Sequence, residues 1–251
     1  MSIKISYKNS VSEKLVKNYV LFANDEFKIN GLNKLSLNKQ SNQINRTINS
    51  NKYKKNEFII FNLNPDQKII LIKIKNDQTA TDNEKKGANF YNFVKSNLLT
   101  NLTFFDNNIY ETQTKNKIFI EEFLHGMQLK SYEFNKYKTK KEMTDININI
   151  MFKKKIPTKI KNNRFTSLLE GTNFTKDLVS EPGNILHPDE YAKRILKLKK
   201  IGLKIKVYNE KELKKLGMGA LLGVGQGSIR GSYLVTWFIS LIFLYIMKFL
   251  Y

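Results

Sequence analysis

The chain has 251 residues, 41% of them hydrophobic, so it is long enough to bury an apolar core as one large domain or two smaller ones. It has no cysteine, which excludes disulfides, thiolate metal sites and a cysteine nucleophile. Its two histidines, His125 and His187, are far apart in sequence, and this excludes a histidine-rich zinc site built from the chain alone.

The formal net charge of +21 at pH 7 raises the question of a polyanionic partner, since clustered cations attract phosphates. All but four of the 43 basic residues are lysines, so the bidentate guanidinium that suits phosphate and guanine is scarce. Lysine, asparagine and isoleucine are all abundant, as A/T-rich codons produce in any protein. We therefore expect the charge to be mainly solvated surface, with weak polyanion binding by runs such as residues 153–164.

In the first part of the chain, short apolar or β-branched runs bounded by Asn, Pro and Asp predict strands. These runs are residues 18–23, 57–63, 68–74, 101–106 and 145–152. Helical spacing of apolar residues predicts helices over 82–98, with Thr81 or Asp82 as the cap, and over 116–138. Because strands alternate with helices, we expect an N-terminal α/β domain on a mixed sheet, spanning residues 1–160.

The second part of the chain has clearer helix boundaries. A helix from residue 164 is expected to stop before Pro182, and Pro188 at the first turn, with acids beside it and lysines later, predicts a helix ended by Gly202. The remaining elements that we expect are strands at 203–209, 220–225 and 232–237 and a short helix at 210–217. The order of helices and strands predicts a right-handed crossover in a second α/β sheet, with 220–225 as a buried strand.

The stretch "LGMGALLGVGQGS", residues 216–228, holds five of the twelve glycines. A dinucleotide fingerprint would need glycine at Ser228, a nucleophile elbow would need glycine at Gln226 and Arg230, and no Gly-Lys-Ser/Thr triplet occurs. We therefore expect no nucleophilic role for Ser228. Gly217 is expected to end a helix in the left-handed region, and the later glycines to turn a buried strand.

The sequences at the two ends of the chain bear on where in the cell the protein is expected. The N-terminal "MSIKISYKNS" has no apolar stretch of signal-peptide length, so we expect a cytoplasmic protein. The uncharged stretch from Gly231 to Met247 is at the lower edge of a membrane span, which keeps a tail anchor open as an alternative. We expect the beginning of this stretch to belong to a sheet and residues 238–251 to form an apolar tail.

Three segments resemble the leucine aminopeptidase (cytosol aminopeptidase) family. "KDLVSEPGNILHP" is similar to the family pattern R-D-L-x-N-x-P-x-N-x-x-x-P, with Lys176 and Ser180 in place of arginine and asparagine. "LGMGALLGVGQGS" is similar to L-G-M-G-x-x-x-x-V-x-x-G-S, and "SYEFNKYK" (residues 131–138) is similar to the family's SYRFNKYK. The motif residues of the two catalytic-domain segments are Asp177, Pro182, Asn184, Pro188, Gly217, Gly219, Gly225, Gly227 and Ser228.

The resemblance implies an N-terminal α/β domain, a linking helix and a larger α/β catalytic domain, usually assembled as a homohexamer. That family removes N-terminal residues from peptides with two divalent cations, manganese or zinc. We assign residues 161–237 to the linking helix and the first part of the catalytic domain, and 238–251 to a tail outside the family pattern. The family's V-G-K-G-x-x-F-D-[ST]-G-G and N-T-D-A-E-G-R segments do not occur, so we assign no catalytic and no metal-binding residue and expect a truncated chain, inactive alone.

Four acids near the first motif offer an alternative oxygen-ligand site. They are Asp177, Glu181, Asp189 and Glu190. We prefer the interpretation in which acids at a helix start interact with its dipole and Asp177 holds the loop around Pro182. His187 is expected beside the N-cap, and His125 to be packed or solvent-facing.

The alternative function is a non-catalytic assembly or nucleic-acid-binding module. The high net charge favours testing it, and the resemblance allows it, since some members of the family bind DNA besides cleaving peptides. We otherwise expect peptide substrates, at most weak nucleic-acid binding, and no membrane partner apart from the apolar tail.

Overall fold

The computed structural model describes residues 3–9, 16–26, 28–30, 37, 41–49, 56–113, 115–139, 145–152 and 164–238. The chain divides into two compact units, Met1–Asn173 and Phe174–Tyr251. The predicted boundary between residues 160 and 161, and most of the predicted tail at 238–251, lie outside the described residues. Among the helices in the described ranges, none combines the length and the apolar character of a membrane span.

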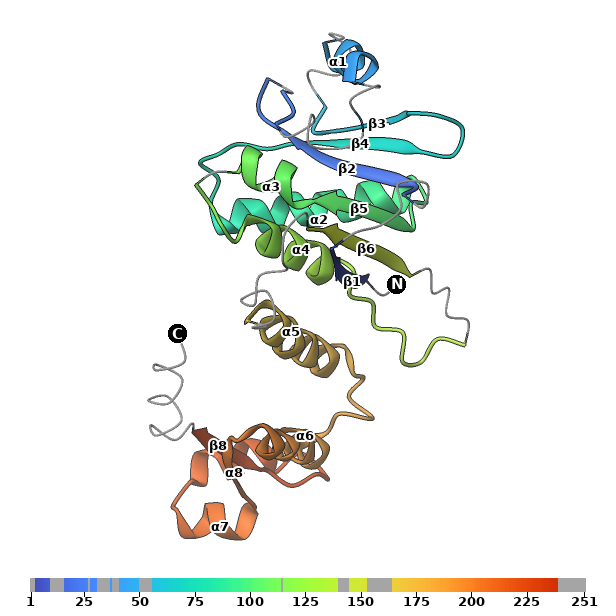
Figure 1. Ribbon diagram of the computed structural model, residues 1–251. Helices are drawn as coiled ribbons and strands as arrows, with labels where there is room; N and C mark the ends of the chain where they lie inside the picture. The colour runs from blue at the N-terminus through green and yellow to red at the C-terminus, as the bar shows by residue number, and fades with distance from the viewer. Residues whose placement is uncertain are drawn as a thin grey trace. The chain divides into compact units, whose positions relative to one another are not determined.

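The first unit contains a mixed sheet in the order β1-β6-β5-β2-β4-β3 (Figure 1). Its strands are β1 Ile3–Lys8, β2 Asn18–Ala23, β3 Phe58–Asn62, β4 Lys68–Lys73, β5 Asn101–Phe105 and β6 Ile146–Met151. Neighbouring strands are parallel, except that β3 pairs antiparallel with β4. The α/β class with a mixed sheet and all five strands predicted in this region are confirmed. Strand β1, in which no residue is fully buried, was not predicted.

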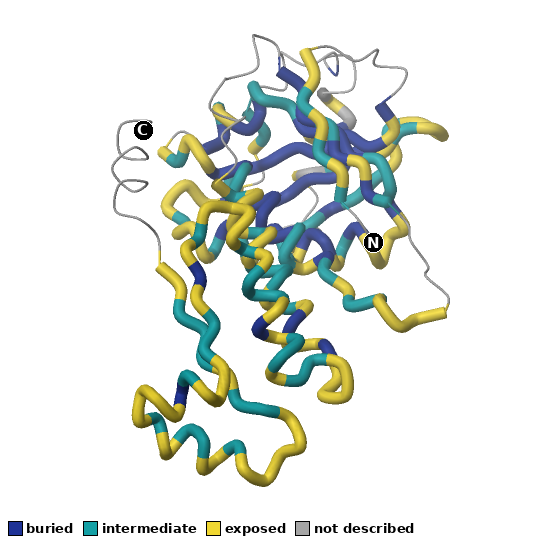
Figure 2. Tube along the Cα trace, turned by 90° about the horizontal axis from the view of Figure 1, so that it is seen from below, coloured by how far each residue is buried: buried dark blue, intermediate teal, exposed yellow. Residues whose placement is uncertain are grey.

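Both faces of the central strands are buried (Figure 2). In β2, Val20 and Phe22 contribute to the core cluster on one face of the sheet, whereas Tyr19 and Leu21 contribute to the cluster on the other face. The second cluster also includes Ile44 of helix α1 (Ser41–Asn49). A parallel sheet covered on both faces explains why β2 and β4 are continuous apolar runs rather than alternating ones.

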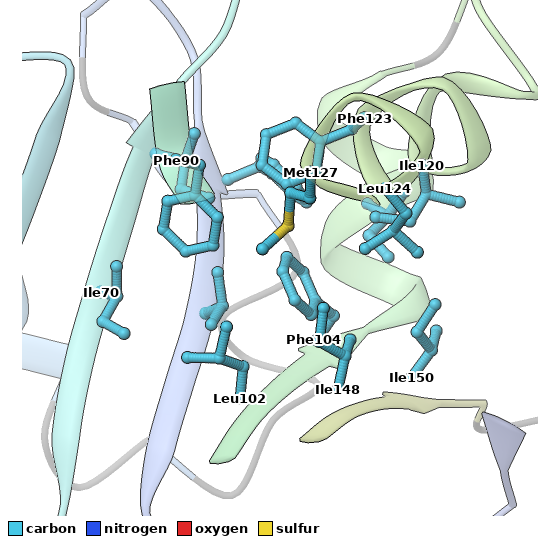
Figure 3. Packing of buried hydrophobic residues seen from close by; sticks show 14 of the residues in the cluster. Ile70, Phe90, Leu102, Phe104, Ile120, Phe123, Leu124, Met127, Ile148 and Ile150 are labelled. Carbon is cyan, nitrogen blue, oxygen red and sulfur yellow. The ribbon is translucent and has the colours of Figure 1, made fainter. Parts of the chain in front are cut away.

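Helices α2 (Ala80–Ser96) and α4 (Phe119–Lys130) cover the first of these faces. Figure 3 shows Phe90 of α2 and Phe123 and Met127 of α4 above Phe104 of the sheet. Both helices were predicted, within 82–98 and 116–138. Helix α1 and the short α3 (Asp106–Thr112) were not, since their sequences are mainly polar.

The start of α2 differs from the prediction. Its N-cap is Thr79, not Thr81 or Asp82, because Asp82 is the third helical residue of a capping box. The Asp82 amide donates to the Thr79 hydroxyl, and the Thr79 amide donates to the Asp82 carboxylate, both at 3.2 Å. The hydrogen bonds from Thr79 lower the pKa of Asp82.

Two glycines set the distance between α2 and α4. A Cβ atom on Gly87 would lie 1.8 Å from the carbonyl oxygen of Phe123, and one on Gly126 would lie 1.9 Å from the carbonyl oxygen of Glu84. Each contact is with backbone, which cannot rotate away as a side chain can. The two helices therefore touch backbone to backbone, and only glycine fits at these positions.

The second unit begins within helix α5 (Arg164–Ser180), which crosses the boundary between the units. Its further elements are α6 Pro188–Leu196, the 3-10 helix η5 Lys197–Ile201, β7 Lys204–Tyr208, α7 Glu210–Lys215, α8 Gly219–Gly225 and β8 Leu234–Phe238. Strands β7 and β8 form an antiparallel pair. The predicted helices from residue 164 to before Pro182, at 188–202 and at 210–217, and the strands at 203–209 and 232–237, are confirmed.

Two predictions for the second unit are wrong. Residues 220–225 form helix α8 with no buried residue, not a buried strand. The short apolar run "ALLGVG" suits either structure, and alanine and leucine are strong helix formers. In place of a parallel crossover, β7 pairs antiparallel with β8, which comes after α8 in the chain.

The glycine contact between α2 and α4 generates a prediction. Gly87→Ala and Gly126→Ala should each lower the free energy of unfolding by about 3 kcal/mol, because the new methyl group forces two backbones apart. Urea unfolding of the full chain, followed by circular dichroism, measures the loss.

The matched control for these variants is Gly171→Ala in α5, where a Cβ would have no neighbour within 4 Å. This change should be neutral or stabilise by up to about 1 kcal/mol, through helix propensity alone. A similar loss of stability at all three positions would contradict the steric explanation.

Candidate functional site

The first motif spans the end of α5, the loop after it and the start of α6. Asp177 lies in the last turn of α5, Pro182 and Asn184 lie in the loop, and Pro188 is in the first turn of α6. The amides of Ile185 and Leu186 both donate to the carbonyl oxygen of Pro182 at 2.9 Å. The predicted helix end before Pro182 and the start at Pro188 are therefore confirmed.

Arg194 of α6 joins the two sides of this loop. Its Nη1 donates to Oε1 of Glu181 at 2.7 Å, and its Nε donates to Oε1 of Glu190 at 3.1 Å. The Glu181 side chain is 1% exposed and the Arg194 side chain 16% exposed. These hydrogen bonds, first to Glu181 and then to Glu190, raise the pKa of Arg194. A buried carboxylate is thus matched by a guanidinium from the next helix.

His187 and Asp189 form a second contact at the start of α6. His187 is itself the N-cap residue of α6, not its neighbour as predicted, and its side chain makes no capping hydrogen bond. Instead its Nδ1 contacts Oδ1 of Asp189. Lys193 lies one turn further along α6, with its Nζ 3.8 Å from Oδ2 of Asp189.

These contacts bear on the alternative oxygen-ligand site. Glu181 and Glu190 face Arg194, and Asp189 faces His187 and Lys193, so these carboxylates lie beside basic side chains rather than around a common point. In the ranges that the structure describes, no three His, Asp or Glu side chains are placed to hold a metal ion. The described residues do not fit the two-cation centre that the family resemblance implies.

The glycine segment contains a helix end and a short helix. Gly217 has φ +69°, its amide donates to the carbonyl oxygen of Lys214, and the Met218 amide donates to that of Leu213. This is the Schellman arrangement, and it confirms the predicted left-handed helix end. Gly219 and Gly225 are the first and last residues of α8.

The end of the glycine segment is held by local contacts. A Cβ on Gly225 would lie 2.0 Å from Oγ of Ser232, so a side chain there would require that serine to move. Gly227 has open space around it. Ser228 is exposed, and its Oγ accepts a hydrogen bond from the Arg230 amide at 3.0 Å. The bond holds a turn.

The third motif, "SYEFNKYK", directly follows α4. Glu133 stands where the family's pattern has arginine, and it accepts hydrogen bonds from Nζ of Lys95 at 3.1 Å and from Nδ2 of Asn135 at 3.2 Å. The hydrogen bond from Asn135, then that from Lys95, lowers the pKa of Glu133 to about 2. The motif is therefore tied to the end of α2.

His125 is packed, which is one of the two alternatives predicted for it. It is buried in α4, its Nδ1 lies 2.8 Å from Oε1 of Glu84, and its ring centroid lies 5.2 Å from that of Phe165 in α5. Its contacts are those of a structural residue at the junction of three helices.

An open polar pocket of about 560 Å³ lies in the first unit, beside the ends of β2 and β4. Its charged lining consists of Lys73, Lys75, Lys86, Asp25, Glu57, Asp77 and Asp82. Lys86 and Glu57 already form an ion pair at 2.5 Å. Because the charged lining consists of three lysines and four acids, it favours neither an anion nor a cation.

Sequence comparison finds the family described as "Cytosol aminopeptidase family, catalytic domain" over residues 173–238. The probable cytosol aminopeptidase of Caulobacter vibrioides is 41% identical over 115 residues, which cover 44% of this chain and 23% of that protein. That of Phytoplasma australiense is 40% identical over 120 residues, covering 47% and 24%. The chain thus spans about a quarter of the length of the relatives that it matches.

Solved structures share the fold over more of the chain. A variant of tomato leucine aminopeptidase has a TM-score of 0.70 at 17% identity, covering 93% of this chain and 50% of that one. Bottromycin maturation enzyme BotP in complex with Mn has a TM-score of 0.61 at 16% identity, covering 88% and 44%. The resemblance to the leucine aminopeptidase family and the α/β fold are confirmed.

Sequence analysis did not identify Arg194 as a central residue. The spacing of Glu190 and Arg194, four residues apart on one helix, predicts their ion pair. The contact with Glu181 depends on the fold of the loop, and no local sequence pattern indicates it.

A first prediction concerns Arg194. Arg194→Ala should lower the free energy of unfolding by about 2 kcal/mol, because a carboxylate buried at Glu181 loses a charged hydrogen-bond donor. Urea unfolding measures the loss, and Lys193→Ala is the control, since Lys193 is 66% exposed and its ion pair is long. That control should change stability by less than about 0.5 kcal/mol. Equal effects of the two variants would contradict a special role for Arg194.

A second prediction concerns pH. The pKa of Glu133 is lowered from 4.5 to about 2 in the folded chain, so its contribution to stability is full above pH 4.5 and is lost as the pH falls toward 2. The difference in melting temperature between the native chain and Glu133→Gln should therefore shrink from pH 6 to pH 2.5. Lys95→Met removes one of the two donors to Glu133, so in that variant the difference in melting temperature should depend less on pH. A difference that stays constant over that range would contradict the assignment.

Proposed function

We propose, from the chain's similarity to the cytosol aminopeptidase family, that its second unit is the beginning of an aminopeptidase catalytic domain. The supporting observation is the family match over residues 173–238, which contains α6, β7, α7, α8 and β8. The mixed sheet of the first unit corresponds, in this proposal, to the α/β domain that precedes the catalytic domain. Helix α5 is the link between them.

The reaction proposed for the complete catalytic unit is removal of N-terminal residues from peptides. Family resemblance implies two divalent cations, manganese or zinc, which polarise the scissile carbonyl and activate water when bound. BotP, one of the structural neighbours, was solved in complex with Mn. The described residues of this chain do not fit such a centre, so none of them is given a step in the chemistry.

The second unit has a structural role in this proposal. The contacts of Arg194 with Glu181 and Glu190 fix the loop between α5 and α6, and Gly217 fixes the end of α7. Because the family's two metal-binding segments do not occur in the sequence, the 251 residues alone should not hydrolyse peptides.

Assembly and location follow the family in this proposal. The complete form is expected to be a homohexamer that acts on peptides, and a cytoplasmic location is supported by the relatives' name, cytosol aminopeptidase.

Activity measurements test both parts of the proposal. The purified chain should show no hydrolysis of leucyl-p-nitroanilide above a buffer blank when manganese or zinc is added. In contrast, residues 173–238 grafted into the Caulobacter relative, in place of its matching segment, should keep activity within about tenfold, or about 1.4 kcal/mol in the barrier.

Two controls make the outcomes interpretable. The unchanged Caulobacter relative shows that the assay works, and gel filtration shows whether the graft assembles like it. A metal-dependent activity of the 251-residue chain would overturn the proposed inactivity. A graft that assembles normally but is inactive would overturn the assignment of the second unit to the catalytic domain.

A further inference from the structure

The polar pocket of the first unit lies where two parallel strands end and a helix begins. Ala23 and Lys73 are the last registered pair of β2 and β4, so both strands end at this edge of the sheet (Figure 1). The antiparallel strand β3 begins beside them, and the Lys73 amide donates to the carbonyl oxygen of Glu57 at 2.9 Å. Helix α2 follows β4 and starts at its cap, Thr79. The carboxyl edge of parallel strands is where open α/β sheets bind ligands.

Hydrogen bonds hold the segment between β4 and α2, which lines one side of this pocket. The Lys75 amide donates to Oε1 of Gln78 at 3.1 Å, and Nε2 of Gln113 donates to the carbonyl oxygen of Lys75. At the helix, the Asp82 carboxylate accepts hydrogen bonds from the amide and the hydroxyl of Thr79, at 3.2 and 2.7 Å. The segment is therefore fixed at both ends, and its ordering on binding should cost little free energy.

Three charged side chains of the lining have no partner of their own. Lys86 and Glu57 neutralise each other in their ion pair, and Asp82 is occupied by the cap of α2. Within the ranges that the structure describes, the three remaining side chains make no ion pair and no side-chain hydrogen bond, and all three are exposed. They are Asp25, Lys75 and Asp77.

One unpaired lysine and two unpaired carboxylates favour a ligand that carries both charges. An anion attracted by Lys75 would be repelled by Asp25 and Asp77, and a cation attracted by the two carboxylates would be repelled by the lysine. A molecule with an ammonium group and a carboxylate group meets an opposite charge at each end and can form a charged hydrogen bond there. The volume of about 560 Å³ is within the range of small-molecule sites.

We propose that this pocket binds a small zwitterion, either a free amino acid or a short peptide with both ends unblocked. Asp25 and Asp77 hold its ammonium group, and Lys75 holds its carboxylate. Because these side chains are exposed, each contact is weak, and we expect a dissociation constant on the order of 1 mM. This binding is independent of the proposed catalytic domain, since all of its residues lie in the first unit and none is a motif residue.

Amide chemical shifts of the isotopically labelled full chain, followed by NMR during titration with leucyl-glycine, test the proposal. EDTA is present, so that no metal ion supports hydrolysis of the dipeptide. The amides of Lys75, Asp77 and Gln78 should shift and saturate at millimolar concentration. Leucyl-glycinamide lacks the carboxylate and N-acetyl-leucyl-glycine lacks the ammonium group, so each should bind at least about fivefold more weakly than leucyl-glycine.

Variants locate the two ends of the ligand. Lys75→Met should weaken binding of leucyl-glycine at least about fivefold and leave binding of leucyl-glycinamide within about twofold, because the amide has no carboxylate to lose. Asp77→Asn should weaken both ligands about threefold, since Asp25 remains. The charge-matched controls are Lys68→Met and Asp66→Asn, exposed at the opposite edge of the sheet, and each should change affinity less than about twofold. Unchanged shifts away from the pocket show that each variant is folded.

The contrary outcomes are distinct. Equal binding of leucyl-glycine and its two blocked analogues would overturn a zwitterion site, and so would shifts confined to residues outside the lining. Equal effects of the lining variants and their controls would mean that only the net charge matters, and would overturn the proposed contacts.

Free leucine, titrated in the same way, distinguishes the two kinds of zwitterion. Binding as tight as that of leucyl-glycine supports a free amino acid as the ligand, and weaker binding supports a short peptide. No binding of either would overturn the proposal. None of these measurements depends on hydrolysis, so a failure here is separate from a failure of the proposed catalytic domain.

Discussion

The backbone contact between α2 and α4 is the constraint on which the first unit depends. Gly87 and Gly126 each place a Cα against a carbonyl oxygen of the other helix, and the close approach brings the rings of Phe90 and Phe123 to a centroid distance of 5.6 Å. The same helices cover one of the two buried faces of the sheet. Layer spacing, ring packing and burial of the sheet thus follow from two positions that lack a side chain.

Much of the fold could be predicted because the central strands are buried on both sides. Runs such as that of β2 cannot be mistaken for surface, and their spacing predicted an α/β sheet. Prediction failed where local sequence suits two structures. The segment 220–225 is short and apolar and forms helix α8, whereas the strand that pairs with β7 lies further along the chain, in β8. The cap of α2 was placed too late because Asp82 has the composition of an N-cap but the position of a third helical residue.

The motif region was recognised from its sequence, but its interactions were not. Pro182, Pro188 and Gly217 act through backbone conformation, which is a local property that spacing reveals. The contact between Arg194 and Glu181 joins residues on either side of a loop, so it depends on the folded path of the chain. The same holds for Glu133 and Lys95, which are brought together only by the packing of α2 with α4.

The second unit contrasts with the first in how little apolar surface its described residues withdraw from water. Only Leu178, Ala192, Ile205 and Leu213 are buried apolar residues among those described there. A two-stranded ribbon with such a small core opens at a low cost in free energy compared with a six-stranded sheet. Amide protons of β7 should therefore exchange with solvent long before those of β2, and a protease should cleave this part of the chain while the sheet of the first unit is still intact.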